Sequence, residues 1–206
     1  MADRKKNAGS EYIKTAKEIA HMRVAGRILA VVLQMIEKEA RPGVSLQSLD
    51  ALAQKLIIEN GAEPAFLGYQ PEGASRPFPA TICASLNEVV VHGVPTKRIL
   101  KAGDLLKLDA GVRYRGYCAD AAVTVAIGDV SVVGYRLIDA AKSALESAIA
   151  IAGPGVRLGD IGYAISHTVR SYGFSVVKGL TGHGIGKKLH EDPSVFNEGE
   201  RGRGMI

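Results

Sequence analysis

Two aspartates, Asp109 and Asp120, are the residues of this sequence whose type and spacing most favour chemistry. Both lie between Leu105 and Ile127, where two apolar, β-prone segments flank a short turn at Arg113–Gly116. This pattern predicts a β-hairpin with one acid at an equivalent place on each arm. Burying an ionised carboxylate in an apolar sheet costs several kcal/mol unless a positive group lies beside it. A metal ion between the two acids would supply that charge.

Imidazole groups recur along the chain near these acids. His92 is at the end of a predicted strand that begins at Ala84, and His183 lies between glycines in the segment TGHGIGKKLHEDP. A lone aspartate more often ends a strand and caps a turn, and a lone histidine is more often a surface or core residue. Two carboxylates with imidazoles and no thiolate, however, form the ligand mix that suits Mn, Fe, Co or Zn in a hydrolytic site. The set together therefore favours a metal-dependent hydrolase.

The composition is that of an ordinary globular protein. The chain has 206 residues, of which 47% are hydrophobic and 23% charged, so it can bury one sizeable core. The first ten residues are polar, and the apolar run from Ala148 to Ala152 is too short to cross a bilayer. We therefore expect a cytoplasmic protein without membrane contact. Cys83 and Cys118 cannot build a disulfide framework and are expected to be reduced, buried thiols.

The net charge of +5 is modest and leaves the partners open. It permits contact with ribosomes or nucleic acid through two basic groups, but a solvated basic face explains the charge equally well. Nothing in the sequence predicts specific nucleic-acid recognition. The two groups are Arg4, Lys5 and Lys6 near the start of the chain, and Lys187, Lys188, Arg201 and Arg203 near its end.

Two helices and a long loop are predicted before the aspartate hairpin. After a polar arm over residues 1–14, Thr15 and Glu18 have the spacing of a capping box, and apolar residues recur with helical period until Arg41–Gly43 ends the helix. A second helix is predicted from Ser45 to Asn60, with Gly61 as its C-terminal glycine. The segment GYQPEGASRPFP, residues 68–79, then predicts an irregular loop at the rim of the site.

The chain also repeats itself at an offset of 112 residues. Residues 41–46 align with residues 153–158, and the same offset pairs Leu49 with Ile161, Ile57 with Val169 and Gly61 with Gly173. Each copy predicts a long helix, a Pro-Gly break and a second helix that ends in glycine. The repeat predicts an α+β fold in which two helix–helix–strands units pair around a pseudo-twofold axis and share one curved antiparallel sheet. The second unit is incomplete, because 33 residues follow its glycine where the first unit uses 66 for strands.

Three ordered motifs resemble a known family. NEVVVHGVP, LKLDAGVRYRGYCAD and TGHGIGKKLHEDP together resemble a type I methionine aminopeptidase of the pita-bread fold, and IAHMRVAG at residues 19–26 is similar to the first helix of that family. The resemblance covers residues 15–206, nearly the whole chain after the polar arm. It implies removal of the N-terminal methionine from nascent proteins when the second residue is small. It also implies a monomeric enzyme that can work at the ribosome.

The resemblance assigns roles to particular residues. Asp109 would bind one of two divalent ions, Asp120 would bridge both, and His183 would bind the other, with Co, Mn, Fe or Zn as the metal. His92 and His190 would be the two imidazoles that contact the substrate. The wall of the methionine pocket would be formed by Phe66, Tyr69, Phe78 and Cys83.

The sequence also departs from the family pattern. The family has five metal ligands, and its last two are glutamates that would follow Ile206, so the resemblance and the repeat both predict a C-terminally truncated chain. We expect weaker metal binding and activity from this fragment than from a longer chain. The loop between Tyr69 and Phe78 is longer than in compact bacterial members.

Two alternatives stay open. A proline-directed peptidase of the same fold would carry an extra N-terminal domain, whereas only about fourteen residues precede the first helix here. A non-catalytic module that binds peptides or the ribosome would be expected to lose its ligands, yet the two acids and three imidazoles are all present.

Overall fold

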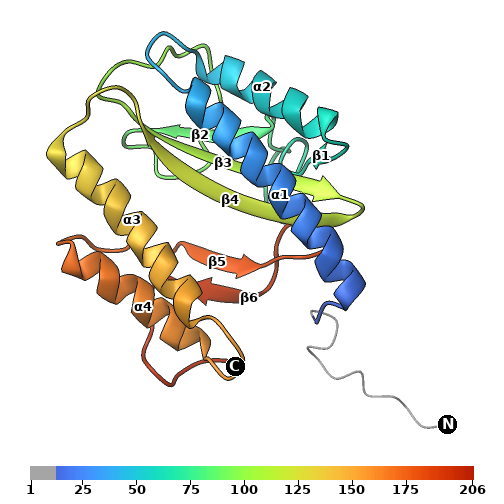
Figure 1. The fold of residues 1–206 in the computed structure, drawn as a ribbon, viewed down its shortest axis with the longest axis vertical. Coiled ribbons are helices and arrows are strands. Elements are labelled where there is room, and N and C mark those ends of the chain that lie inside the picture. The colour runs from blue at the N-terminus through green and yellow to red at the C-terminus, as the bar shows by residue number, and fades with distance from the viewer. Residues whose placement is uncertain (1–12) are drawn as a thin grey trace.

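A computed structural model describes residues 13–206 of the chain, and Figure 1 shows their arrangement. The predicted polar arm, with Arg4, Lys5 and Lys6, lies outside the described residues apart from its last two positions. The first unit comprises α1 (Ala16–Glu39), α2 (Leu46–Glu59), β1 (Glu63–Pro64), β2 (Ile82–Leu86), β3 (Leu105–Tyr114) and β4 (Tyr117–Ala126). The second unit comprises α3 (Val132–Ile151), α4 (Leu158–Ser171), β5 (Thr181–Gly184) and β6 (Glu191–Phe196).

The long helix α1 begins and ends where the sequence predicts. The side chain of Thr15 accepts a hydrogen bond from the Glu18 backbone N–H, and the Glu18 carboxylate accepts one from Thr15 N at 2.7 Å, which completes a capping box. The helix ends before Gly43, whose φ of +93° few other residues adopt. By length and composition alone α1 could cross a membrane, but a core helix passes the same test, and α1 packs against β3 and β4 (Figure 1).

The hairpin of β3 and β4 is the centre of the first unit. Its arms pair over ten residues each and are joined by Arg115 and Gly116, both with positive φ, as in the turns that favour tight hairpins. β4 lies along one edge of β3, while β1 and β2 pair in succession along the other edge. Alternate residues of β3 face α1 and α2 and are fully buried: Leu106, Leu108, Ala110 and Val112. Asp109 therefore lies on the opposite face of the sheet.

The internal repeat is confirmed by the helices. α2 and α4 each have 14 residues, and both their first and their last residues are 112 positions apart. α1 and α3 end 112 positions apart, at Glu39 and Ile151. Gly61 and Gly173 follow the second helix of each unit with φ of +70° and +82°. Among the described residues the first unit carries four strands and the second two, so the second unit is the smaller one, as predicted.

The cores of the two units differ in kind. The buried residues of α1 include the large side chains Ile28, Leu29, Val32, Leu33 and Ile36. The buried residues of α3 and α4 are small instead, and they are Gly134, Ala140, Ala144, Ala148, Gly162 and Ser166. Because buried apolar area stabilises a fold, the second unit gains less from burial than the first.

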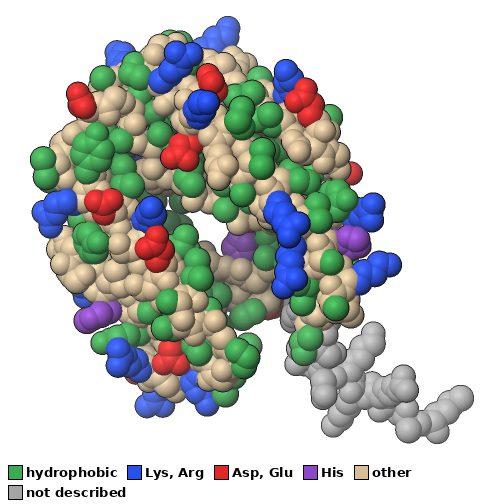
Figure 2. All heavy atoms as spheres, in the orientation of Figure 1, with side chains coloured by type: hydrophobic (Ala, Val, Ile, Leu, Met, Phe, Trp, Pro, Cys, Tyr) green, Lys and Arg blue, Asp and Glu red, His purple; other side chains and the backbone are tan. Residues whose placement is uncertain are grey.

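All strand pairs are antiparallel, as expected, but they form a four-stranded and a two-stranded sheet rather than one continuous sheet. The connection between β5 and β6 reaches the turn end of the hairpin, where Cys118 N donates to Gly186 O at 2.7 Å. An opening remains elsewhere between the two units, and Figure 2 shows it. Below, the seam means the contact between the two units at this end of the hairpin, where Cys118 meets Gly186 and Asp120 meets His183.

One predicted strand is shorter than expected. We expected a strand from Ala84 to His92, but β2 ends at Leu86. Asn87 follows with a φ of 51°, and its side chain accepts a hydrogen bond from Leu105 N and donates one to Asp104. This left-handed residue turns the chain away from the sheet, so that Val89, Val90 and Val91 are exposed despite their β-prone sequence.

Candidate functional site

Asp109 and Asp120 lie together on the hairpin face that points away from α1. Asp120 pairs with Gly111 and Asp109 pairs with Ala122, so the two acids are diagonal neighbours on one face. Burial, the charge of Asp120 and a hydrogen bond with Asp120 together raise the pKa of Asp109 to about 7, and burial contributes most. Burial also raises the pKa of Asp120, which the nearby His183 opposes. The fold thus brings the two predicted acids together where a second negative charge is unfavourable.

The glycine opposite Asp120 makes room for an aromatic ring. A Cβ atom on Gly111 would lie 2.6 Å from Phe66 Cε1 and 3.1 Å from the Cβ of Ala65. The first contact is shorter than real Cβ contacts and the second is tight, so a side chain here would push Phe66 out of its present position against the strand. The ring therefore lies beside the acid pair.

His183 reaches the acid pair from the other side of the seam. Its Nε2 lies 3.5 Å from Asp120 Oδ2, and its Nδ1 lies 2.9 Å from Gly184 O. Because a carbonyl oxygen only accepts hydrogen bonds, Nδ1 carries the proton in the neutral ring and Nε2 has a free lone pair. That lone pair and the carboxylate face each other, as two ligands of one cation do.

Two glycines that follow His183 lie very close to neighbouring segments. A Cβ on Gly184 would lie 2.3 Å from Asp192 O, and one on Gly186 would lie 2.4 Å from Lys14 Cε. These two glycines thus allow the segment to pack closely against the start of β6 and against Lys14, which lies just before the N-cap residue of α1.

His190 lies next to His183, with 4.2 Å between their ring centroids. Its Nδ1 forms a hydrogen bond of 2.7 Å with the hydroxyl of Tyr69, from the predicted rim loop. Partial burial lowers the pKa of His190, and the positive charges that His183 and His92 would carry lower it further. The neutral ring is therefore favoured in the metal-free chain.

His92 is exposed and lies farther out, near enough that its charge lowers the pKa of His190. Its φ is 57°, and the residue after it, Gly93, packs against β2 so closely that a Cβ there would lie 2.5 Å from Ala84 O. Gly93 also donates to Ser85 Oγ and accepts from Ala84 N. The docking of Gly93 to the edge of β2 thus fixes where His92 leaves the sheet.

The residues predicted to form the pocket wall lie in one apolar cluster, separate from the main core. Phe66 and Cys83 are buried in it, and Tyr69 and Phe78 pack against it. Burial, with smaller contributions from the charges of Asp109 and Asp120, raises the pKa of the Cys83 thiol to about 12, so this thiol stays neutral. Sequence reasoning missed four members of the cluster, which are Ala65, Cys118, Ile185 and Leu189. Leu189, which is 2% exposed, directly precedes His190, and an apolar residue beside a predicted site histidine was the available clue.

The donor set fits a divalent cation, although the side chains are not gathered into a finished metal centre. Within residues 13–206 no group of three or more His, Cys, Asp or Glu side chains lies close enough to hold a metal ion. The fit rests on the charges. Asp109 and Asp120 are adjacent, partly buried and have raised pKa values, and Nε2 of His183 faces Asp120. A cation here would offset the repulsion between the two carboxylates and would bind the imidazole nitrogen.

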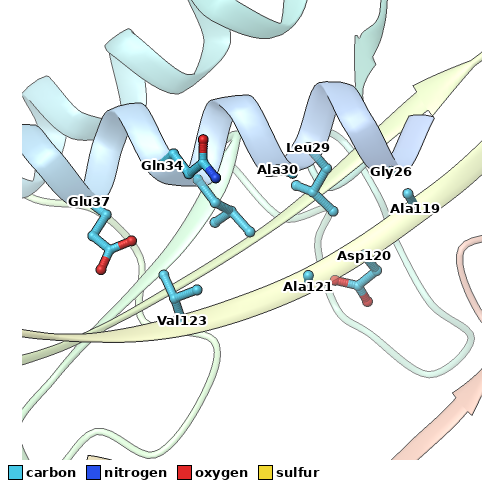
Figure 3. Close-up of a pocket in the computed structure, with 10 residues that line it drawn as sticks. Gly26, Leu29, Ala30, Gln34, Glu37, Ala119, Asp120, Ala121 and Val123 are labelled. Atoms are coloured by element: carbon cyan, nitrogen blue, oxygen red, sulfur yellow. The ribbon is translucent and has the colours of Figure 1, made fainter. Parts of the chain in front are cut away.

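A separate groove of about 430 Å³ lies on the other side of β4, against α1. Figure 3 shows Leu29, Gln34 and Val123 along it. Asp120 is at its rim, but its carboxylate points away from α1, toward the side on which β5 and β6 lie (Figure 3). The groove and the acid pair are therefore on opposite faces of the hairpin.

Comparisons with known proteins agree with this architecture. Residues 20–206 match the sequence model of metallopeptidase family M24. A methionine aminopeptidase from Clostridium acetobutylicum is 45% identical over 193 residues, which are 93% of this chain and 75% of that protein. The crystal structure of a methionine aminopeptidase from Thermotoga maritima superimposes with a TM-score of 0.89 at 39% identity, over 94% of this chain and 76% of that one. An Xaa-Pro dipeptidase from Bacillus anthracis gives a TM-score of 0.77 at 24% identity, a likeness of fold alone.

Proposed function

We infer that this chain, which belongs to metallopeptidase family M24 and within it to the methionine aminopeptidases, removes N-terminal methionine from nascent proteins whose second residue is small. The observation that carries the proposal is the meeting of Asp109 and Asp120 with His183 and His190 across the seam, beside an apolar cluster. An acid pair for metal ions and an apolar pocket are what a metal-dependent enzyme for methionine needs.

Asp109, Asp120 and His183 would hold the divalent ions, for which Co, Mn, Fe or Zn are suited by the oxygen and nitrogen donors. When bound, such ions supply Lewis acidity to the scissile carbonyl and to the attacking water. Asp120 lies between Asp109 and His183, so it is the residue placed to serve both. In the neutral ring, the hydrogen bond that His183 Nδ1 donates to Gly184 O leaves the lone pair on Nε2, which faces Asp120.

The two remaining histidines would act on the substrate. His190, next to His183, would donate a hydrogen bond to the oxygen that becomes negative in the transition state, and His92 would bind near the peptide nitrogen. Because these donors are already oriented, they stabilise the transition state, which carries this charge, more than they stabilise the bound substrate. This difference raises the rate.

The cluster beside the acids would receive the methionine side chain. Phe66, Tyr69, Phe78 and Cys83, with Leu189, offer an apolar surface, and a thioether packs well against aromatic rings. Close packing of Gly93 on β2, next to His92, leaves little room at the second residue of the substrate. A second residue larger than alanine or serine would be rejected by steric overlap in the transition state.

A peptide panel tests this proposal. With Co²⁺ or Mn²⁺ added, we expect the protein to release methionine from Met-Ala-Ser and Met-Gly-Ser, and much less from Met-Leu-Ser or Met-Lys-Ser. The D120N variant, which lacks the carboxylate that would hold the ions, is the matched control and should lose activity by orders of magnitude while it stays folded. Release of leucine from Leu-Pro peptides with Met-Ala peptides untouched would instead show the proline-directed peptidase. Specific peptide binding without turnover in any metal would show the non-catalytic module.

The cellular setting is also a proposal. We place the protein in the cytoplasm as a monomer that meets nascent chains at the ribosome. Two of the basic residues near the end of the chain have partners on different helices. Lys187 Nζ lies 3.4 Å from Glu18 Oε1 of α1, and Arg201 Cζ lies 4.4 Å from the ring centroid of Tyr163 on α4. The predicted basic group is thus divided between two elements, which favours a solvated basic face over a dedicated nucleic-acid surface.

A further inference from the structure

We propose that Tyr69 is a positioning residue that holds His190 in the tautomer whose proton is on Nε2, the nitrogen that would meet the substrate. The proposal rests on the function inferred above for its purpose, but the contact itself is a property of the metal-free chain. The hydroxyl of Tyr69 lies 2.7 Å from His190 Nδ1, and the two ring centroids are 5.3 Å apart.

Tyr69 is held in place by the base of the long rim loop. Phe78 N donates to Tyr69 O at 2.8 Å, Gly68 N donates to Phe78 O at 2.9 Å, and Tyr69 N donates to Phe66 O at 2.9 Å. These bonds close the loop at its root, so the residues from Gln70 to Pro77 can extend outward without moving Tyr69. The ring also packs against the apolar cluster that contains Leu189, the neighbour of His190. Both partners of the hydrogen bond are therefore held by contacts other than that bond.

The direction of the hydrogen bond sets the tautomer. A phenol hydroxyl donates readily, and a separation of 2.7 Å is typical of O–H donors, whereas N–H donors usually lie at about 2.9–3.0 Å. When the Tyr69 hydroxyl donates to Nδ1, the single proton of the neutral ring must be on Nε2. His183 is the opposite case, because its Nδ1–H donates a hydrogen bond to Gly184 O, so that Nε2 of the neutral ring carries no proton.

The two adjacent rings, 4.2 Å apart, thus present opposite chemistry. His183 offers a lone pair, which a metal ion needs, and His190 offers a proton, which a developing oxyanion needs. If His190 adopted the other tautomer, its Nε2 would repel the same oxyanion. A single hydroxyl group on the rim loop therefore separates the roles of two chemically identical side chains.

The test is nitrogen-15 NMR of the histidine side chains in the metal-free protein near neutral pH, with the His190 signals assigned by their loss in H190Q. In the wild type we expect a protonated Nε2 and an unprotonated Nδ1 for His190. In Y69F, which keeps the ring and its packing, the two nitrogen shifts should move toward each other as the tautomers mix. Y163F is the matched control, because Tyr163 stacks on His167 at 5.4 Å with no hydroxyl-to-imidazole hydrogen bond among the described contacts. Y163F should leave both nitrogen shifts of His190 unchanged.

A protonated Nδ1 in the wild type, or unchanged His190 shifts in Y69F, would overturn the proposal. The activity readout is separate from this. In the metal-loaded protein, Y69F should lower kcat by about tenfold with KM changed less than about twofold, since an oriented donor acts mainly in the transition state. A KM increase with normal kcat would show that Tyr69 serves only as pocket wall and would also overturn it. Complete inactivity of the wild type with the expected NMR pattern would refute the proposed function and leave the tautomer assignment standing.

Discussion

The carboxyl group of Asp109 is the most perturbed acid of the site, with its pKa raised to about 7 by burial and by Asp120. In an unfolded chain an aspartate titrates near 3.9. The folded metal-free chain therefore binds more protons than the unfolded chain between these values, so its stability falls as pH rises from about 4 to 7. The loss attributable to this acid is at most about 4 kcal/mol, because Asp120 shares the proton.

We predict that D109N removes this pH dependence. In urea unfolding without metal, the difference in free energy of unfolding between D109N and the wild type should grow in favour of the variant from pH 5 to pH 8. D139N, which changes an exposed acid on α3, is the control and should follow the wild type at every pH. An equal effect of the two variants would mean that Asp109 does not have the raised pKa described above.

Metal binding should depend on pH in the opposite direction. Because Asp109 must lose its proton to act as a ligand, the affinity for Mn²⁺ or Co²⁺ should rise between pH 6 and pH 8, with proton release at the lower pH. Isothermal titration calorimetry in two buffers of different ionisation enthalpy measures both the metal affinity and the number of protons released. D120N and H183Q should each weaken binding by at least about tenfold. The same affinity at both pH values, or full binding by D120N, would exclude this ligand set.

At the scale of the elements, the packing of Phe66 against Gly111 of β3 leads to a prediction about stability. G111A would place a methyl group against Phe66 and Ala65, and overpacking of this kind usually costs about 1–3 kcal/mol. It should also displace Phe66 and so weaken binding of methionine more than binding of alanine. G26A, on α1, adds the same methyl group where nothing lies within 4 Å, and it should stabilise the helix by up to about 1 kcal/mol. Unfolding curves of the two variants test the contrast, which equal stability changes would contradict.

The elements that the sequence predicted well are those specified by neighbours along the chain. The capping box at Thr15, the two helices of each unit and the Arg-Gly turn of the hairpin are all local patterns, and all are found as predicted. The strand that should have reached His92 failed because Asn87 is fixed by side-chain hydrogen bonds to residues at the start of β3, which lie 17 and 18 positions away. Local β propensity could not anticipate that tertiary contact.

In the site, too, the residue types could be predicted from the sequence, but their tertiary contacts could not. The acids, imidazoles and aromatic residues were identifiable by type, and the fold brings them into one neighbourhood. Their pairing was not identifiable, because it depends on contacts across the seam. The bond between Tyr69 and His190 joins residues 121 positions apart, and Leu189 enters the cluster only when the second unit packs on the first.

At the scale of the whole molecule, the site lies on the boundary between two units of unequal core. Asp109, Asp120 and Tyr69 come from the first unit, and His183 and His190 come from the second. Further contacts cross the seam at the same end, including an ion pair between Lys14 and Glu191 at 2.5 Å and the Cys118 backbone bond to Gly186. Any motion of one unit against the other would therefore change the site before it changed either core.

The small side chains that fill the second unit have a consequence for how the molecule opens. Hydrogen exchange should detect two cooperative folding units, with amides of α3 and α4 exchanging faster than those of α1 and α2, because alanine and glycine contacts hold the former pair. A cation that takes ligands from both units would bind only when they are together, so saturating Mn²⁺ should slow exchange in α3 and α4 far more than in α1. Uniform slowing, or none, would contradict this. A bound metal ion would then couple the two units, so that they unfold together in one cooperative transition.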